Sequence, residues 1–199
     1  MELSFENNTI KLSRTLSIVD EFTFEFVKLL EKAGISYAIV SGYAALLFGR
    51  ERITEDIDIL FDRNDKDKIE KLYELISKDY WLLNARSFDS AMALLKENSA
   101  VRIAKKDTIS PNIELKPAKN EFDDYSLSNA TTVIVNKKHE ILISPLELQI
   151  PYKLYLSSKK DLEDARFLYD IFREKIDKNK LSYFCGKLGV ADKIHYLGD

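Results

Sequence analysis

An alternation of acidic and apolar residues, Asp56-Ile57-Asp58-Ile59, constrains the fold of this chain more than any other feature of its sequence. Side chains two positions apart on a β-strand point to the same face, so Asp56 and Asp58 project together while Ile57 and Ile59 face a core. Two carboxylates this close repel each other unless a cation lies between them. The run therefore predicts a strand with one buried face and one face that holds a cation.

The chemistry of that cation follows from its ligands. Magnesium binds oxygen atoms and is commonly shared between protein carboxylates and substrate phosphates. Asp56 and Asp58 are therefore candidate catalytic residues and ligands of Mg²⁺ or Mn²⁺, which would neutralise both the aspartates and a triphosphate.

A third carboxylate is expected, because such a site often activates an attacking hydroxyl or completes a second metal position. Glu114 lies between two apolar residues in a strand-like stretch and is the candidate, ahead of Asp107, Asp123 and Asp124. We expect the carboxyl groups of residues 56, 58 and 114 to converge within a few ångströms, as one shared metal site requires.

A second motif precedes the acidic pair. Residues 37–40 favour a short buried strand, Ser41-Gly42 follows as a tight corner, and residues 43–48 favour a short helix. The start of a helix leaves backbone N–H groups free to bind an anion. Gly42 lets the backbone approach a phosphate closely, and the Ser41 hydroxyl can donate a hydrogen bond to it. We interpret this corner as a phosphate-binding turn beside the metal pair.

Residues 37–61 resemble the nucleotidyltransferase superfamily, whose signature is a small-residue turn, a short helix and then Asp-x-Asp on a strand. The residues similar to its minimal members, which are related to AbiEii-type toxins, are Ser41-Gly42-Tyr43-Ala44, Gly49, Arg52, Thr54 and Asp56 to Ile59. The second half of that group is similar in Ser144-Pro145, Lys153-Leu154 and the pair Asp161 and Asp164. The resemblance covers roughly residues 35–172, and it is weak in the middle of this stretch.

This resemblance implies magnesium-dependent transfer of a nucleoside monophosphate from a nucleoside triphosphate to a hydroxyl, with pyrophosphate as the leaving group. Arg52, Thr54 and Lys153 are then nucleotide-binding candidates together with Ser41 and Gly42. Arg52 can equally pair with neighbouring glutamates, and Lys153 can be a solvated surface lysine. The relatives usually carry glycine at the position of Ser41, and serine fits there if its backbone angles stay ordinary.

The hydroxyl that receives the nucleotide is not specified by the sequence. An RNA 3′ end, a protein hydroxyl and a small molecule such as an aminoglycoside all remain open. The rival interpretation is a relative that no longer catalyses and binds a nucleotide or a protein partner, as a homodimer or as half of a toxin–antitoxin pair. Ser41 and the unproven role of Glu114 keep this rival open.

The overall pattern predicts one compact α+β unit, with strands in the middle and helices at both ends. We expect a nucleotidyltransferase-like mixed sheet flanked by helices over residues 1–144, with an N-terminal helix over residues 16–32. Residues 145–199 should form helices packed on this core. Ser144 is expected to cap the first of them, with Pro145 in its first turn.

Composition limits the partners and the compartment. The 30 basic and 33 acidic residues among 199 give a net charge of −3, so no general attraction to nucleic acid or to an anionic membrane is expected. The single cysteine, Cys185, excludes an intramolecular disulfide. Because no apolar run reaches membrane-spanning length and the first residues lack the blocks of a secretory signal, we expect a cytoplasmic protein.

Overall fold

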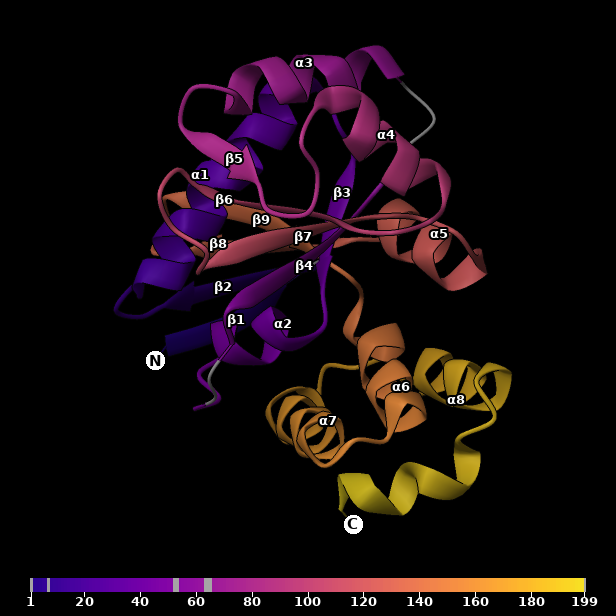
Figure 1. The fold of residues 1–199 in the computed structure, drawn as a ribbon. Helices are drawn as coiled ribbons and strands as arrows, with labels where there is room; N and C mark the ends of the chain where they lie inside the picture. The colour runs from indigo at the N-terminus through magenta and orange to yellow at the C-terminus, as the bar shows by residue number, and fades with distance from the viewer. Residues whose placement is uncertain (1, 7, 52–53, 63–65, 199) are drawn as a thin grey trace.

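The computed structural model describes residues 2–6, 8–51, 54–62 and 66–198, and these form an α+β fold with one mixed sheet and flanking helices, as predicted (Figure 1). The strands are β1 (Glu2–Glu6), β2 (Thr9–Ser13), β3 (Tyr37–Val40), β4 (Asp56–Phe61), β5 (Tyr80–Leu82), β6 (Val101–Lys105), β7 (Asn112–Pro117), β8 (Thr131–Val135) and β9 (His139–Ile143). The helices are α1 (Ile18–Ala33), α2 (Gly42–Leu47), α3 (Lys66–Ile76), α4 (Phe88–Lys96), α5 (Glu121–Ser128), α6 (Leu146–Leu156), α7 (Lys159–Phe172), α8 (Lys178–Lys187) and the 3₁₀ helix η1 (Ala191–Leu197).

The described strands form a sheet in the order β1-β2-β8-β9-β3-β4-β7-β6-β5. Three neighbouring pairs are parallel, namely β2 with β8, β3 with β9, and β4 with β7, and the other pairs are antiparallel. Strand β4 therefore lies inside the sheet, antiparallel to β3 on one side and parallel to β7 on the other. This position brings three segments that are distant in sequence to the same part of the sheet.

The N-terminal hairpin corrects the expected order of elements. Strands β1 and β2 precede the first helix, so the strands are not confined to the middle of the chain. Both segments alternate apolar and polar residues, with Leu3 and Phe5 in β1 and Ile10 and Leu12 in β2, and the two residues of β2 are buried. The hairpin extends the sheet because β2 pairs with β8, whose partner β9 comes directly after it.

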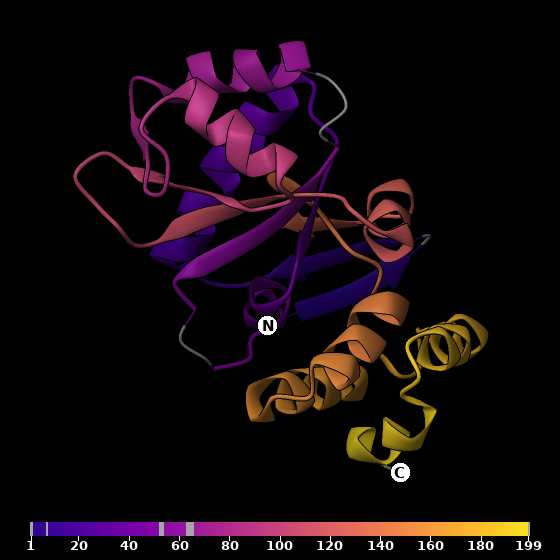
Figure 2. The same ribbon diagram turned by 45° about the vertical axis from the view of Figure 1, so that its right-hand side comes forward.

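Helix α1 covers one face of the sheet together with α3 and α4 (Figures 1 and 2). A capping box formed by Ser17 and Asp20 starts α1, and Gly34 ends it with φ +77°, a conformation that glycine adopts without strain. The apolar face of α1 is fully buried, with Phe26 and Leu30 at 0% exposure. The predicted N-terminal helix is confirmed, shifted by one or two residues at its ends.

The C-terminal helices α6, α7 and α8 lie together beside the sheet, and α7 packs against α2 (Figure 1). One detail differs from expectation, because Pro145 occupies the N-cap position of α6 and Ser144 does not cap it. The Ser144 hydroxyl is instead 2.8 Å from that of Ser126 on α5, and this buried contact competes with capping. None of the helices in the described part of the chain has the length and apolarity needed to cross a bilayer.

A buried ionic network joins α1 to α2. The carboxylate of Asp20 has 0% exposure, contacts the guanidinium of Arg14, and accepts hydrogen bonds from the Tyr43 hydroxyl at 2.9 Å and the Ser17 backbone N–H at 2.7 Å. Burial and the adjacent Asp20 carboxylate raise the pKa of Tyr43 well above its usual value. Tyr43 therefore stays a hydrogen-bond donor and fixes α2 against α1.

We predict that Asp20→Ala lowers the free energy of unfolding by about 3 kcal/mol, because it removes the buried partner of the half-buried Arg14 and of the Tyr43 hydroxyl. Urea denaturation followed by circular dichroism measures this loss. Asp89→Ala, which removes the exposed first-turn acid of α4, is the matched control and should cost less than about 1 kcal/mol. Equal losses in the two variants would contradict this view of Asp20.

Candidate active site

The three acids predicted from the sequence lie on neighbouring strands. Asp56 and Asp58 are on β4, with Ile57 and Ile59 fully buried on the opposite face. In the parallel pair of β4 with β7, Asp58 is in register with Glu114 and Asp56 with Asn112. Residues in register project to the same face of a sheet, so the structure brings the three carboxylates together on one face.

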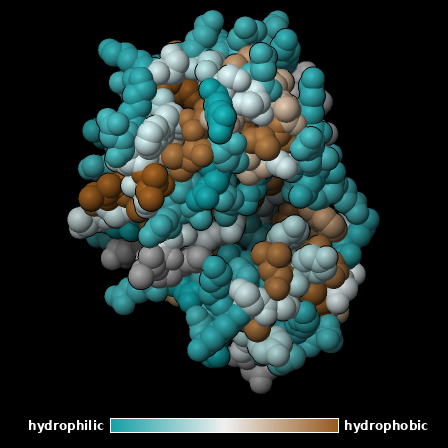
Figure 3. Space-filling model, viewed as in Figure 1, coloured by the Kyte–Doolittle hydropathy of each residue, from teal (hydrophilic) through white to brown (hydrophobic). Residues whose placement is uncertain are grey.

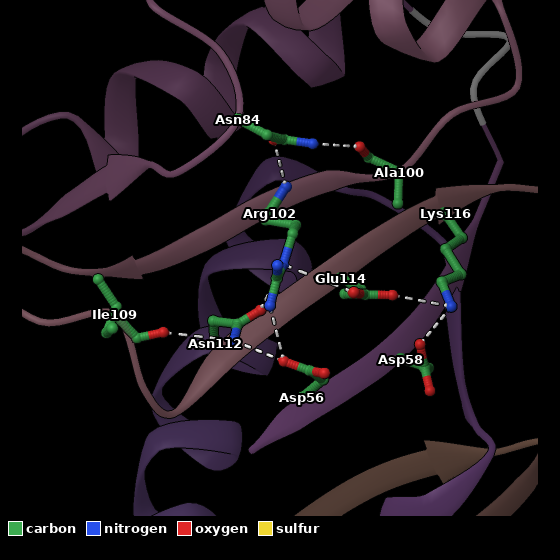
Figure 4. A network of polar contacts seen from close by, with 9 residues as sticks. All are labelled: Asp56, Asp58, Asn84, Ala100, Arg102, Ile109, Asn112, Glu114 and Lys116. Atoms are coloured by element: carbon green, nitrogen blue, oxygen red, sulfur yellow. Dashed lines mark hydrogen bonds and ion pairs between the residues drawn. The ribbon is translucent and has the colours of Figure 1, made fainter. Parts of the chain in front are cut away.

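Two basic side chains of the sheet are paired with these acids (Figure 4). The Arg102 guanidinium on β6 is 3.0 Å from Asp56 Oδ1 and 3.5 Å from Glu114 Oε1. The Lys116 ammonium on β7 contacts Asp58 Oδ1 and is 3.0 Å from Glu114 Oε2. Asn112 Nδ2 donates a further hydrogen bond of 2.7 Å to Asp56. Each acid therefore has a cation or a donor beside it.

Sequence reasoning missed Arg102, Asn112 and Lys116. A signal for two of them was present, since Asn112 and Lys116 are two positions from Glu114 on the same strand and so share its face. Arg102 is the register partner of Glu114 on β6, which only the pairing of the strands reveals. Burial lowers the pKa of Lys116, but the carboxylates of Asp58 and Glu114 outweigh this and raise it, so Lys116 is a cation at neutral pH.

The expected convergence of the acids on one point is not found. In the ranges that the structure describes, no group of three or more His, Cys, Asp or Glu side chains is arranged to hold a metal ion. Arg102 is paired with Asp56 and Glu114, whereas Lys116 is paired with Asp58 and Glu114. The three carboxylates are therefore held by two separate cations and do not meet at one point. The donor set still has the chemistry of a hard-cation site, because its ligands are carboxylate oxygens. Asp58 and Glu114 are close enough to contact the same ammonium group.

The Ser41 turn lies directly beside Asp58. Strand β3 is antiparallel to β4 with Val40 opposite Asp58, so the next residue, Ser41, follows at the same end of the site. Ser41 has φ +64° and ψ −135°, which corrects the expectation of ordinary backbone angles. Helix α2 spans only six residues, so an anion at this turn would be bound by the free N–H groups of its first turn and not by a helix dipole.

A cavity of about 350 Å³ lies between this end of the sheet and α6, and the surface is hollowed between the sheet and the C-terminal helices (Figure 3). Its lining includes the predicted site residues Ser41, Asp58 and Lys153, together with Lys116. The volume lies at the lower end of the range typical of small-molecule pockets, which is about 300–1,000 Å³. The site therefore opens into a space that can hold a ligand.

The remaining nucleotide-binding candidates occupy different environments. Lys153 is buried, and its ammonium is 2.8 Å from Asp164, which also contacts Arg50. Lys153 is therefore not a solvated surface lysine. Thr54 is half-buried two residues before β4 and is not among the described residues that line the cavity. Arg52 lies outside the described residues.

Comparisons with known proteins address the fold. No protein-family model matches this sequence, and no curated protein is significantly similar to it. Among solved structures, an antigenic nucleotidyltransferase-like protein from Paracoccidioides brasiliensis matches with a TM-score of 0.55 at 19% identity, over 92% of this chain and 94% of its own. The antibiotic-resistance factor ANT(2'')-Ia matches at 0.53 and 14% identity, over 90% of this chain and 99% of its own.

A second structure of ANT(2'')-Ia, in complex with adenylyl-2''-tobramycin, has a TM-score of 0.53 and 13% identity, over 85% of this chain and 95% of its own. The fold is nucleotidyltransferase-like. At these identities, the nucleotidyltransferase-like fold is what the matches establish, and the narrower resemblance to AbiEii-type toxins stays a prediction.

The conformation of Ser41 leads to a stability prediction for this nucleotidyltransferase-like fold. Holding a non-glycine residue at positive φ destabilises the folded state by about 1–3 kcal/mol. Glycine relieves this strain, but it loses more conformational entropy on folding, so only part of the strain energy is recovered. We predict that Ser41→Gly raises the free energy of unfolding by about 1 kcal/mol in urea denaturation.

Two control variants separate backbone strain from the loss of the hydroxyl. Ser36→Gly should destabilise the protein, because Ser36 is exposed and is not among the described residues with positive φ. Ser41→Ala should not stabilise it, because alanine keeps the strained conformation. A stabilising Ser41→Ala or a destabilising Ser41→Gly would refute the presence of strain at this turn.

Proposed function

We propose that this chain is a magnesium-dependent nucleotidyltransferase that moves a nucleoside monophosphate from a nucleoside triphosphate to a hydroxyl group. The observation that carries this proposal is the position of Asp56, Asp58 and Glu114 on one face of adjacent strands, with Asp58 lining the cavity that Ser41 also lines. Phosphate groups need positive charge around them, and the cavity lining includes Lys116, Lys119 and Lys153, although Lys153 is paired with Asp164 and Lys116 with Asp58 and Glu114.

Asp56, Asp58 and Glu114 would hold Mg²⁺ (or Mn²⁺), which when bound neutralises the phosphates and polarises the α-phosphate. For this, the side chains of Arg102 and Lys116 must turn away from the acids. Their side-chain exposures of 41% and 38% leave room for such a movement. The two freed cations would then lie beside the triphosphate.

The chain's own residues would perform the remaining steps. The Ser41 hydroxyl and the N–H groups at the start of α2, including Gly42, would donate hydrogen bonds to the outer phosphates. As the alternative to its role as a metal ligand, Glu114 would accept the proton of the attacking hydroxyl. That oxygen forms a bond to the α-phosphorus while the bond to the bridging oxygen breaks in line, and pyrophosphate leaves. Lys153, which lines the cavity, would contact the nucleotide.

The class of molecule that carries the hydroxyl is part of the proposal. A structure of the fold relative ANT(2'')-Ia contains adenylyl-2''-tobramycin, an adenylylated aminoglycoside. This supports a small hydroxyl-bearing molecule over an RNA 3′ end or a protein hydroxyl. The net charge of −3 also gives no general attraction to nucleic acid.

A second candidate function is a nucleotidyltransferase-like module that binds a nucleotide or a protein partner without transfer, as in an AbiEii-like toxin–antitoxin pair. The pairing of Arg102 with Asp56 and of Lys116 with Asp58 favours it, because the acids are already neutralised by the protein. The positive φ of Ser41 favours it too. The two candidates differ in whether the acids exchange these partners for a metal.

We predict that nucleoside triphosphates bind in the presence of Mg²⁺, and that Asp56→Asn or Asp58→Asn weakens this binding at least about tenfold, because each removes one metal-binding carboxylate. Isothermal titration calorimetry with and without magnesium measures the effect. Asp107→Asn is the matched control, since Asp107 is an exposed acid in the turn before β7 and its positive φ suits asparagine.

Transfer of an α-labelled phosphate to a panel of aminoglycosides and other hydroxyl compounds, to RNA and to protein then separates catalysis from binding. Transfer that requires magnesium and both aspartates supports the enzyme. Tight binding without any transfer supports the second candidate, and binding that is indifferent to magnesium and to both aspartates contradicts the proposed site.

We also predict that Lys116→Met makes the protein respond more strongly to a divalent cation. Without the ammonium, Asp58 and Glu114 repel each other, so the variant should melt at a lower temperature in EDTA. Added Mn²⁺ should then raise its Tm more than that of the wild type, by about 2–4 °C for each kcal/mol regained. Lys105→Met, which breaks the exposed pair of Lys105 with Glu25, is the control and should show no added response. An unchanged response to Mn²⁺ in Lys116→Met would argue against a cation site between the two acids.

A further inference from the structure

Gln149 on α6 has an unusual environment for an amide. The residue is 4% exposed and lines the cavity, and its Nε2 donates a hydrogen bond of 2.8 Å to the backbone carbonyl of Ser144. The Oε1 atom is buried and has no hydrogen-bond partner among the described residues. A flipped amide would place Oε1 against the Ser144 carbonyl, so this hydrogen bond fixes which atom is the free acceptor.

A buried acceptor without a partner is costly, by about 1–3 kcal/mol, and such groups are rare in folded proteins. Because Gln149 lines the cavity, a ligand bound there would be placed to supply the missing donor. An N–H group of the ligand would satisfy Oε1, whereas a carbonyl oxygen at the same place would face it with two lone pairs and no proton.

The rest of the cavity indicates what kind of ligand carries that N–H group. Helix α6 also presents Tyr152 and Leu156 to the cavity, and Phe122 of α5 lines it as well. Burial and the nearby Asp123 carboxylate raise the pKa of Tyr152, so it remains a neutral aromatic ring at physiological pH. The lining combines apolar and aromatic side chains with lysines and the Ser41 turn, which suits a molecule with a flat ring and an anionic end.

We propose that Gln149 recognises the nucleobase of the nucleotide, by accepting a hydrogen bond from the 6-amino group of adenine or the 4-amino group of cytosine. This inference rests on the proposed function, because it places the phosphates at Ser41 and Asp58 and the base at α6 in the same cavity. Pairing of glutamine with the adenine amino group is a common mode of recognition. The hydroxyl-bearing substrate is a weaker occupant of this wall, because a sugar or a similar molecule lacks the flat apolar surface that these residues fit.

The test compares nucleotides that differ in the recognised group. ATP and ITP differ in the amino or carbonyl group at purine position 6, and CTP and UTP differ in the same way at pyrimidine position 4. Dissociation constants are measured by isothermal titration calorimetry with magnesium for these four nucleotides and GTP. We expect ATP or CTP to bind most tightly, and to bind about tenfold more tightly than its carbonyl counterpart, which is the effect of leaving one buried acceptor unpaired.

The variant Gln149→Met keeps the size of the side chain and removes the amide, so this preference should fall to within about twofold. Because Gln149 also holds the Ser144 carbonyl, the ratio of the two affinities is compared rather than the affinity itself. Leu146→Met, on the same helix and not among the described residues that line the cavity, is the control and should keep the preference.

Four outcomes would overturn the inference. Tightest binding by GTP, ITP or UTP would do so, and so would a preference that survives in Gln149→Met. Equal binding of all five nucleotides would exclude base recognition by Gln149 while leaving the proposed function intact. If no nucleotide binds in the presence of magnesium, both proposals fail together.

Discussion

The placement of β4 between β3 and β7 sets the electrostatics on which this structure depends. The register of β4 with β7 brings Asp58 beside Glu114, and the alternation along β4 adds Asp56 on the same face. Like charges this close must be offset by cations. The sheet supplies two of them, Lys116 on β7 and Arg102 on β6. The same geometry that assembles an acidic site therefore also assembles its internal counter-ions. The two candidate functions differ in whether a metal ion can displace these internal counter-ions from the acids.

Much of the fold could be predicted because its signals are local. The alternation in β4 and the helical periodicity of α1 each depend on residues that are close together in the sequence, and both elements are where the sequence predicted them. The hairpin of β1 and β2 was missed because two short alternating segments have no visible partner in sequence, and that partner, β8, comes more than a hundred residues later. Helix α5 was missed because its start depends on a single cap, Asn120, and its apolar face is weak.

The candidate site shows the same division between local and distant information. Asp56, Asp58 and the Ser41-Gly42 turn were identified because each belongs to a compact motif on one strand or one corner. Arg102 and Gln149 could not be, because their relation to the acids and to the cavity comes from strand pairing and from the packing of α6. Lys153 and Asp164 are a further example of information that comes only from packing. Their buried contact, joined by Arg50, links α6, α7 and the segment after α2, so that residues read as separate candidates form one support behind the cavity.

The parallel pairing of β3 with β9 has a consequence for how the chain is made. Ile39 pairs with Ile143, so β3 leaves the ribosome about one hundred residues before its neighbour, which at about 5–20 residues per second corresponds to several seconds. The early strands β2 and β3 are separated in the finished sheet by β8 and β9, and they cannot occupy their final places during that interval. Until β8 and β9 are made, the nascent chain can form the contact of β1 with β2 and the contacts among β3, β4, β7, β6 and β5. Completion of the sheet therefore awaits the late hairpin that inserts between these two parts.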